Sequence, residues 1–179
     1  MLQALTPSQG AKLISPNIYT LITCIDSKGQ PNAIGASWVT RTSIDPFLML
    51  ISIAFTRYSH DEIARMGEFV IHYPNEEQAS GAWLCGVESG RNQNKIKKAG
   101  LKLVDSRIVR TPTIDDVTVA FECETKNSFI TGDHTVFVGE VVAVTGNPVK
   151  NKHLYYTANS GLMSLDLTGN INKNIEKDR

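Results

Sequence analysis

The chain has 179 residues, with 18 basic and 18 acidic side chains and a pI near 6.9. A domain of this length buries roughly 70% of its unfolded surface, so it needs no disulfide or metal to fold. The balanced charge gives no sign of the basic face that a nucleic-acid partner requires, so we expect no such partner. The three cysteines show no pairing pattern, which suits the reducing cytoplasm.

The longest apolar run, residues 47–55, is too short to cross a bilayer as a helix, and residues 1–11 lack a signal-peptide pattern. We therefore expect a cytoplasmic protein with no membrane partner. No internal repeat or linker divides the chain. We expect one domain over residues 1–168 and a loose polar tail over residues 169–179.

The first half of the chain predicts strands at hairpin spacing. Strands are expected over residues 18–25, 31–40 and 47–54, and the turn at 26–29 joins the first two as a hairpin. The third is apolar almost throughout, so we expect it to be buried on both faces. Ser59 precedes Glu62 by three residues, a capping-box pattern that predicts a helix ending at Gly67.

The second half is also rich in strands. A strand at 68–73 precedes a helix that Asn75 and Gln78 cap by the same pattern, and a further short helix ends at Gly100. Residues 117–124 alternate apolar and polar, which predicts a strand with Glu122 on its wet face. Another strand begins near His134. Because strands outnumber helices, we predict a mainly β fold, an antiparallel barrel with a few short capping helices.

The strand expected over residues 31–40 has an unusual composition for a core strand. Asn32, Gly35, Ala36, Ser37 and Thr40 are small or polar. Small residues let a flat ligand lie against the backbone, although an edge strand with a solvated face has the same composition. Trp38 favours the ligand, because an indole offers a stacking face and one N–H donor.

Two segments offer groups that suit a phosphate. Arg57 precedes the helix expected after Ser59, where free N–H groups and the helix dipole attract anions. Its guanidinium adds a fork of donors, and Ser59 adds a hydroxyl. Lys95 ends a second polar loop, residues 89–95, that runs into a basic helix. Taken alone, an ordinary helix cap and a solvated loop are the simpler interpretations.

His134 follows a Gly-Asp turn and opens a strand, so its ring is held on a rigid element. It is a candidate for contact with a ligand, and the alternative is a structural histidine bonded to the backbone. Gly139 in the same strand indicates that something close by leaves no room for a side chain. The histidines have no metal-ligand spacing, so we expect no metal site. The dinucleotide-binding, P-loop and hydrolase nucleophile motifs are absent.

The order and spacing of several short motifs resemble the flavin reductase-like family of FMN-binding split β-barrels, and most of all its flavoredoxin branch. The resemblance covers roughly residues 10–165. The motifs are Gly35-Ala36-Ser37-Trp38-Val39-Thr40, Asp45-Pro46, Arg57-Tyr58-Ser59, Gly67-Glu68-Phe69-Val70, Gly132-Asp133-His134 and Gly139-Glu140-Val141.

The resemblance implies a Greek-key split β-barrel that forms a homodimer, with FMN near the subunit interface. It places His134 near the reactive side of the flavin or the incoming nicotinamide. It also assigns three groups of cofactor-binding residues: Asn32, Ser37, Trp38, Val39 and Thr40 along the ring, Ser52 and Ile53 along the ribityl chain, and Arg57, Ser59 and Lys95 at the phosphate.

The function that the resemblance implies is an FMN-dependent oxidoreductase. It is either a flavin reductase with NADH or NADPH as transient donor, or a flavoredoxin-type electron carrier with a redox partner protein such as a ferredoxin. A non-catalytic flavin-binding module and a plain structural domain are the other classes. These classes can be distinguished by testing whether the purified protein retains flavin and which donor, if any, reduces it.

Overall fold

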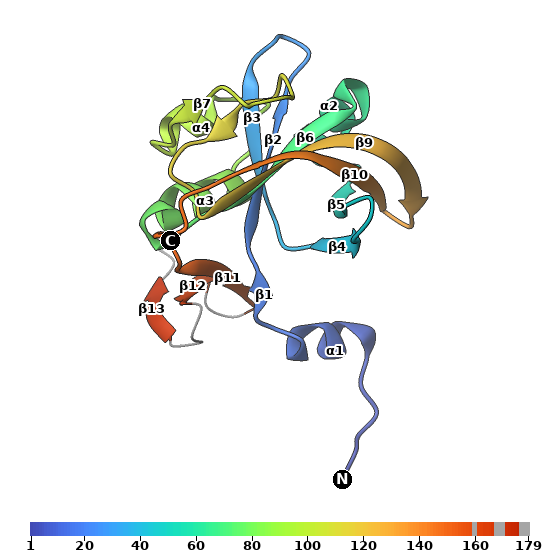
Figure 1. Ribbon diagram of the computed structural model, residues 1–179. Coiled ribbons are helices and arrows are strands. Elements are labelled where there is room, and N and C mark those ends of the chain that lie inside the picture. The colour runs from blue at the N-terminus through green and yellow to red at the C-terminus, as the bar shows by residue number, and fades with distance from the viewer. Residues whose placement is uncertain (159–160, 167–170, 176–179) are drawn as a thin grey trace.

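The computed structural model describes residues 1–158, 161–166 and 171–175, and a seven-stranded antiparallel sheet dominates it (Figure 1). The strand order in this sheet is β3-β2-β6-β9-β10-β5-β4. The strands are β2 (Thr20–Ile25), β3 (Pro31–Ala36), β4 (Val39–Ser43), β5 (Leu48–Ala54), β6 (Glu68–Tyr73), β9 (Val119–Thr131) and β10 (His134–Thr145).

Strands β3 and β4 lie at opposite ends of the sheet, yet only Ser37 and Trp38 separate them in the chain. Because so short a connection spans roughly 10 Å, the sheet must curl until its ends approach each other. No pairing joins β3 to β4 among the described residues, which leaves a seam between β3 and the β4–β5 pair. The prediction of one strand over 31–40 was therefore wrong, because the chain crosses the seam at Ser37 and Trp38.

In the described part of the chain, four short α-helices and one 3-10 helix lie outside the sheets, and the first of them is in the N-terminal segment. They are α1 (Pro7–Leu13), α2 (Tyr58–Met66), the 3-10 helix η1 (Glu76–Gln78), α3 (Ala79–Val87) and α4 (Lys95–Lys98). Gly67 ends α2 with φ 68°, as predicted. The capping box of Asn75 and Gln78 is confirmed at the start of η1.

Two smaller sheets complete the fold. One has the order β1-β11-β12-β13, and β7 pairs with β8 in the other. We expected a loose tail over residues 169–179. The structure places 171–175 in strand β13, and the rest of that segment lies outside the described residues. The strands are β1 (Asn17–Ile18), β7 (Leu103–Val104), β8 (Thr113–Ile114), β11 (His153–Thr157), β12 (Gly161–Leu165) and β13 (Ile171–Ile175).

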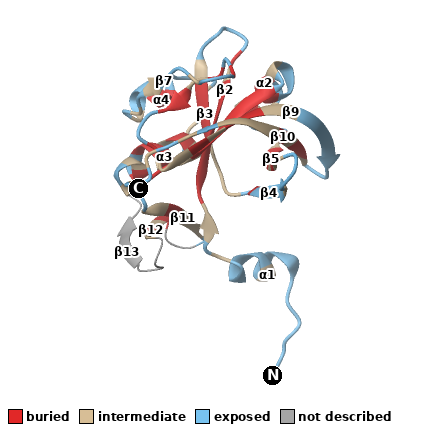
Figure 2. Ribbon diagram, in the orientation of Figure 1, coloured by how far each residue is buried: buried red, intermediate tan, exposed pale blue. Residues whose placement is uncertain are grey.

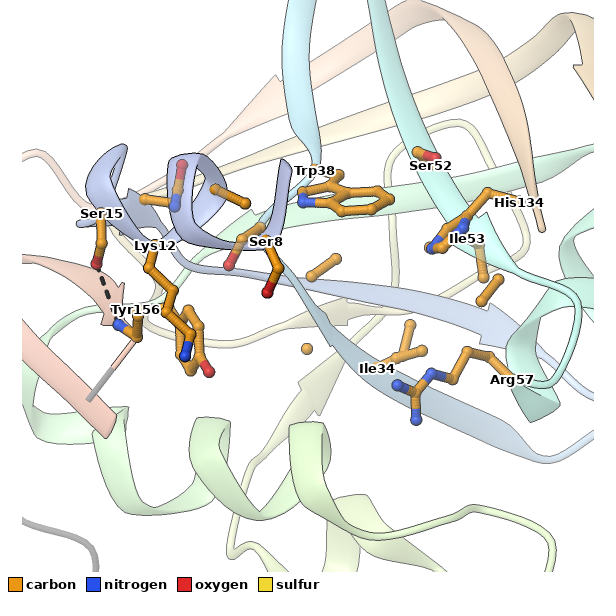
Figure 3. A pocket seen from close by; sticks show the side chains of 17 residues that line it. Ser8, Lys12, Ser15, Ile34, Trp38, Ser52, Ile53, Arg57, His134 and Tyr156 are labelled. Carbon is orange, nitrogen blue, oxygen red and sulfur yellow. Dashed lines mark hydrogen bonds between the residues drawn. The ribbon is translucent and has the colours of Figure 1, made fainter. Parts of the chain in front are cut away.

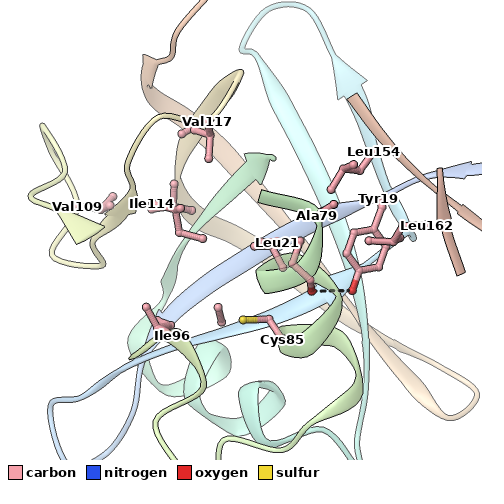
Figure 4. Packing of buried hydrophobic residues seen from close by; sticks show 14 residues of the cluster. Tyr19, Leu21, Ala79, Cys85, Ile96, Val109, Ile114, Val117, Leu154 and Leu162 are labelled. Carbon is pink, nitrogen blue, oxygen red and sulfur yellow. Dashed lines mark hydrogen bonds between the residues drawn. The ribbon is translucent and has the colours of Figure 1, made fainter. Parts of the chain in front are cut away.

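The apolar core has two parts, and the central strands β2 and β6 contribute residues to both. Figure 2 shows these strands among the buried parts of the chain. Ile51, Phe69 and Phe137 fill the barrel. Leu21 and Leu154 belong to the second cluster, which lies against α3 (Figure 4). The predicted mainly β fold, antiparallel with a few short helices, is confirmed.

Two strand faces differ from the sequence-based expectation. Strand β5 alternates buried and half-buried residues, because one of its faces is only partly covered. Glu122 was expected on the solvent-exposed face of its strand, but it is fully buried. The loop after β7 covers it, and its carboxylate accepts the backbone N–H groups of Arg107 and Ile108 at 2.8 Å and Val109 at 3.2 Å. A buried carboxylate needs such partners, and the loop supplies them.

Among the described residues, no helix has the length and apolar character to span a bilayer, and no three His, Cys, Asp or Glu side chains cluster as metal ligands would.

Candidate functional site

A cavity of about 400 Å³ lies along the seam (Figure 3). Its walls come from residues 34–38, from 52–54 on β5, and from His134 at the start of β10. Strand β4 pairs with β5 only as far as Ile51, so residues 52–54 extend beyond it. Gly35, Ala36 and Ser37 are small, which keeps this space open.

Two aromatic rings stand together at the cavity wall. The ring centroids of Trp38 and His134 are 4.6 Å apart. The Trp38 carbonyl accepts the Ser52 N–H at 3.0 Å, and the indole is 61% exposed. His134 Nδ1 lies 2.6 Å from the Asp133 carboxylate, and this hydrogen bond lowers the pKa of Asp133. The bond fixes Nδ1–H as the donor and leaves Nε2 available to a ligand.

A second cavity of about 280 Å³ continues from the first, because Ile34 and Arg57 line both. Its other walls are the start of α2 and residues 86–91. Arg57 is exposed, and no hydrogen bond or ion pair in the described part of the chain engages its guanidinium. A cation without a partner at the junction of two cavities can bind an anion.

Close packing sets the width of the second cavity. The Tyr19 hydroxyl donates to the Ala82 carbonyl at 3.2 Å. A Cβ on Gly35 would lie 1.9 Å from that hydroxyl oxygen, and one on Gly86 would lie 2.0 Å from it. Only glycine at both positions lets α3 approach β3 this closely. A Cβ on Gly90 would likewise lie 2.2 Å from the Asn32 amide oxygen, so the loop after α3 packs against β3.

The arginine of that loop forms part of the same wall. The Arg91 guanidinium donates to the Thr56 carbonyl at 3.1 Å and lies 5.6 Å from the centre of the Tyr58 ring. The Tyr58 hydroxyl donates to Asp26 at 3.0 Å. These bonds fasten the first turn of α2 to its neighbours, so Arg57 stands on a fixed element.

The structure brings most of the predicted binding residues to the two cavities. Asn32, Val39 and Thr40 are not on the walls. The Asn32 amide is buried and donates to the Ser59 hydroxyl oxygen at 2.8 Å, Val39 packs in the barrel core, and Thr40 is exposed on β4. The first cavity is lined by Ser37, Trp38, Ser52, Ile53, Arg57 and His134, and the second by Arg57, Ser59 and Lys95.

Ser59 and Lys95 are held differently from what the sequence predicts. Helix α2 begins at Tyr58 with Arg57 as its N-cap and no side-chain cap, so the prediction of Ser59 as N-cap was wrong. Ser59 is taken into the first turn because Asn32 binds its hydroxyl. Lys95 Nζ donates to the carbonyls of Cys85 at 2.8 Å and Glu88 at 3.0 Å, and burial lowers the pKa of Lys95. One N–H of this ammonium is left for a ligand.

Sequence analysis missed the other end of the first cavity. Ser8, Lys12, Ser15 and Tyr156 line it. Pairing of β1 with β11 brings the N-terminal segment beside Tyr156. The Ala158 N–H donates to the Ser15 hydroxyl oxygen at 3.1 Å. Only long-range strand pairing creates this neighbourhood, so no local pattern predicts it.

The two cavities together suit a long, flat ligand with an anionic end. The small residues and the Trp38–His134 pair accept a planar ring, and the free Arg57 suits the anion. No acidic side chain lines the first cavity among the described residues. An antiparallel barrel that is open along one unpaired seam is a split barrel, and here a ligand-sized cavity lies along that seam.

The chain belongs to the flavin reductase like domain family, whose family model matches residues 14–164. The resemblance found from the sequence motifs is thereby confirmed. An uncharacterised protein of Archaeoglobus fulgidus is 38% identical over 72% of this chain and 73% of its own length. The NADH:riboflavin 5'-phosphate oxidoreductase of Streptomyces pristinaespiralis is 29% identical, over 82% of this chain and 80% of its own.

Solved structures share the fold at low identity. The flavoredoxin from Methanosarcina acetivorans superposes with a TM-score of 0.82 at 20% identity, covering 97% of this chain and 96% of its own. An FMN-binding protein from Thermus thermophilus, solved with bound p-hydroxybenzaldehyde, gives a TM-score of 0.80 at 24% identity, covering 92% and 94%. At these identities the likeness establishes the fold alone.

Proposed function

We propose that this chain binds FMN in the two joined cavities and acts as an FMN-dependent oxidoreductase. One observation carries the proposal: a cavity with two aromatic rings in its wall leads directly to an arginine that has no partner in the described chain. The family and the names of its relatives support a flavin as the ligand.

The residues divide between the parts of FMN. Residues 35–37 and Trp38 would hold the ring, and Ser52 and Ile53 would lie along the ribityl chain. Arg57 would bind the phosphate, with the remaining N–H of Lys95 behind it. Bound FMN supplies hydride and electron transfer. His134 Nε2 can accept a hydrogen bond from an N–H of the ring or take up a proton at that edge, because the N–H of the neutral imidazole lies on Nδ1 and is bonded to Asp133.

The electron donor in this proposal is NADH or NADPH, or a redox partner protein if the chain is a carrier. The name of the Streptomyces pristinaespiralis relative supports a nicotinamide donor. We also propose a cytoplasmic location, because the described free cysteines are all buried thiols, as a reducing compartment permits.

A homodimer is part of the proposal. Large apolar side chains are exposed at the cavity wall and at the end of β9: Trp38 by 61%, Phe129 by 49% and Ile130 by 73%. Phe129 and Ile130 stand opposite Val136 and Thr135, next to His134. A second copy would cover these side chains and close the site. Light scattering of the FMN-loaded protein measures this directly, and a monomer at micromolar concentration would refute the dimer.

The first experiment is the visible spectrum of the purified protein after incubation with excess FMN and desalting. We expect about one FMN per chain, followed by anaerobic bleaching with NADH or NADPH. Bound FMN that neither nucleotide reduces would identify a carrier with a protein donor or a binding module. No FMN in this test and in a calorimetric titration would refute the proposed function.

A further inference from the structure

The seam cavity extends beyond the part assigned to the flavin. At the end away from Arg57 it is lined by Ser8, Lys12, Ser15 and Tyr156, here called the Lys12 end (Figure 3). Trp38 lies between this end and the His134 wall in the same view. The Lys12 end is therefore open to a molecule that lies next to a flavin bound against Trp38.

The charged side chains that line this cavity are all basic. Lys12 and Arg57 line it at opposite ends, and no acidic side chain does so among the described residues. Lys12 is exposed, and within the described ranges no carboxylate pairs with its ammonium. A cation without a counter-charge in a cavity free of carboxylates favours an anionic ligand.

The neighbouring groups can complete an anion site. The Ser15 hydroxyl oxygen accepts the Ala158 N–H, so its own O–H can donate to a ligand. Ser8 adds a second hydroxyl. The Tyr156 ring is held by stacking on Trp83, with centroids 6.4 Å apart and planes at 13°, and it gives a flat ligand an aromatic wall.

We propose that the Lys12 end binds the anionic group of the second reactant, a flat aromatic molecule that carries a carboxylate or a phosphate. This inference rests on the proposed function. FMN has a single phosphate, and Arg57 at the cavity junction takes it. Lys12 is therefore left for the anion of the molecule that exchanges electrons with the flavin.

The test is equilibrium binding to the FMN-loaded protein, by calorimetry. The probes are two pairs of matched ring and different charge: benzoate with benzamide, and phenyl phosphate with phenol. The variants are Lys12→Ala, Lys12→Glu and Lys12→Arg. The matched control is Lys97→Ala, which removes an exposed lysine from α4, outside both cavities.

We expect the wild type to bind the anionic member of at least one pair more tightly than its matched partner. The pair that shows this identifies the source as a carboxylate or a phosphate. Lys12→Ala should lower the affinity for that probe about fivefold, and Lys12→Glu should lower it about tenfold or more. Lys12→Arg should keep the wild-type affinity. The partner lacking the anion and the Lys97→Ala variant should show no change, and added salt should shrink the difference.

Several outcomes would overturn the assignment. Equal loss of the charged and uncharged probes would mean that Lys12 supports the fold and not the anion. Unchanged binding of every anionic probe in Lys12→Glu, or no probe binding at all to the FMN-loaded wild type, would refute it outright. A loss of FMN affinity in Lys12→Glu would assign Lys12 to the flavin instead. Wild type that takes up no FMN contradicts the proposed function, so the two failures are distinguishable.

Discussion

Arg57 joins the two halves of the site, because it lines both cavities and has no partner in the described chain. The rest of the second cavity is already engaged. Arg91 donates to the Thr56 carbonyl, Lys95 donates two of its three N–H groups to the carbonyls of Cys85 and Glu88, and Ser59 accepts from Asn32. At the residue scale, an anion in this place depends first on Arg57.

Replacing Arg57 with alanine should therefore weaken the binding of FMN more than the binding of riboflavin, since only FMN carries the phosphate. Hydrogen bonds to charged groups contribute about 1.5–3 kcal/mol, so we expect FMN affinity to fall by about 10- to 100-fold. Fluorescence titration with both ligands measures the difference, and Arg57→Lys should keep part of the affinity. Equal losses for FMN and riboflavin would contradict a phosphate role.

The Trp38–His134 pair makes a second prediction at this scale. Trp38→Ala should weaken flavin binding about fivefold or more, because it removes about 1 kcal/mol of ring stacking. His134→Ala should slow flavin reduction, because the hydrogen-bond and proton acceptor at Nε2 is lost. Flavin titration and anaerobic stopped-flow measure these effects, and Trp38→Phe should retain most of the binding. Unchanged affinity and reduction rate in both alanine variants would refute the site assignment.

At the element scale, the site depends on how α2 is fixed to β10. Helix α2 follows Arg57, and β10 begins with His134. His60 joins them: its Nε2 lies 2.8 Å from the Thr135 hydroxyl, its Nδ1 lies 2.7 Å from Asp61, and its ring packs edge-on against Phe137. The Phe55 N–H also donates to the Asp133 carbonyl at 3.2 Å. The spacing of Arg57 and His134 is thus set by a few bonds.

Thr135→Val keeps the shape of the side chain and removes the hydroxyl. We expect a loss of about 1–2 kcal/mol in the free energy of unfolding, because His60 Nε2 loses its partner. FMN affinity should fall as well, because Arg57 and His134 lose their fixed separation. Urea unfolding and flavin titration test this against Thr145→Val at the far end of β10. Lost stability with unchanged FMN affinity would show that the bond supports the fold alone.

The sequence predicts features that are set within a few residues. The hairpin of β2 and β3, the end of α2 at Gly67 and the capping box at Asn75 are all local, and all are found. Gly139 also has the close neighbours that were expected. A Cβ there would lie 2.7 Å from Phe69 and 2.8 Å from Cys123, which are core residues and not a ligand.

What the sequence does not predict depends on distant contacts. The break at Ser37 and Trp38 follows from closure of the sheet, which no window of residues contains. The alternation of apolar and polar residues places Glu122 on the solvent-exposed face of its strand, but the loop after β7 covers and buries it. For the same reason six of the predicted ligand residues line the first cavity, while Lys12 and Tyr156, brought there by β1 and β11, were missed.

At the scale of the whole molecule, a buried histidine ties the barrel to the smaller β7–β8 sheet. His72 Nδ1 donates to the Leu21 carbonyl at 3.1 Å, and its Nε2 accepts the Ile114 N–H at 2.9 Å. The second bond requires the neutral ring, because a charged imidazole cannot accept. Burial lowers the pKa of His72 from 6.5 to about 4.

This makes stability depend on pH in a defined direction. Because the folded pKa lies below the unfolded one, the unfolded chain binds the extra proton. The contribution of His72 is fully present above pH 6.5 and is lost as the pH falls towards 4, a change of about 3 kcal/mol. Urea midpoints from pH 7.5 to 4.5 should fall more steeply for wild type than for His72→Gln. Parallel curves would contradict the assignment.

The seam has a consequence for the exchange of backbone amide protons with solvent. Strand β3 has a partner on only one side, and residues 52–54 extend past the end of β4. Apart from the Ser52 N–H, which the Trp38 carbonyl accepts, the backbone groups that face the seam lack the pairing that a closed cylinder would provide. A molecule bound in the seam would take the place of the missing strand. Deuterium uptake at these amides therefore reports, residue by residue, whether the seam is filled.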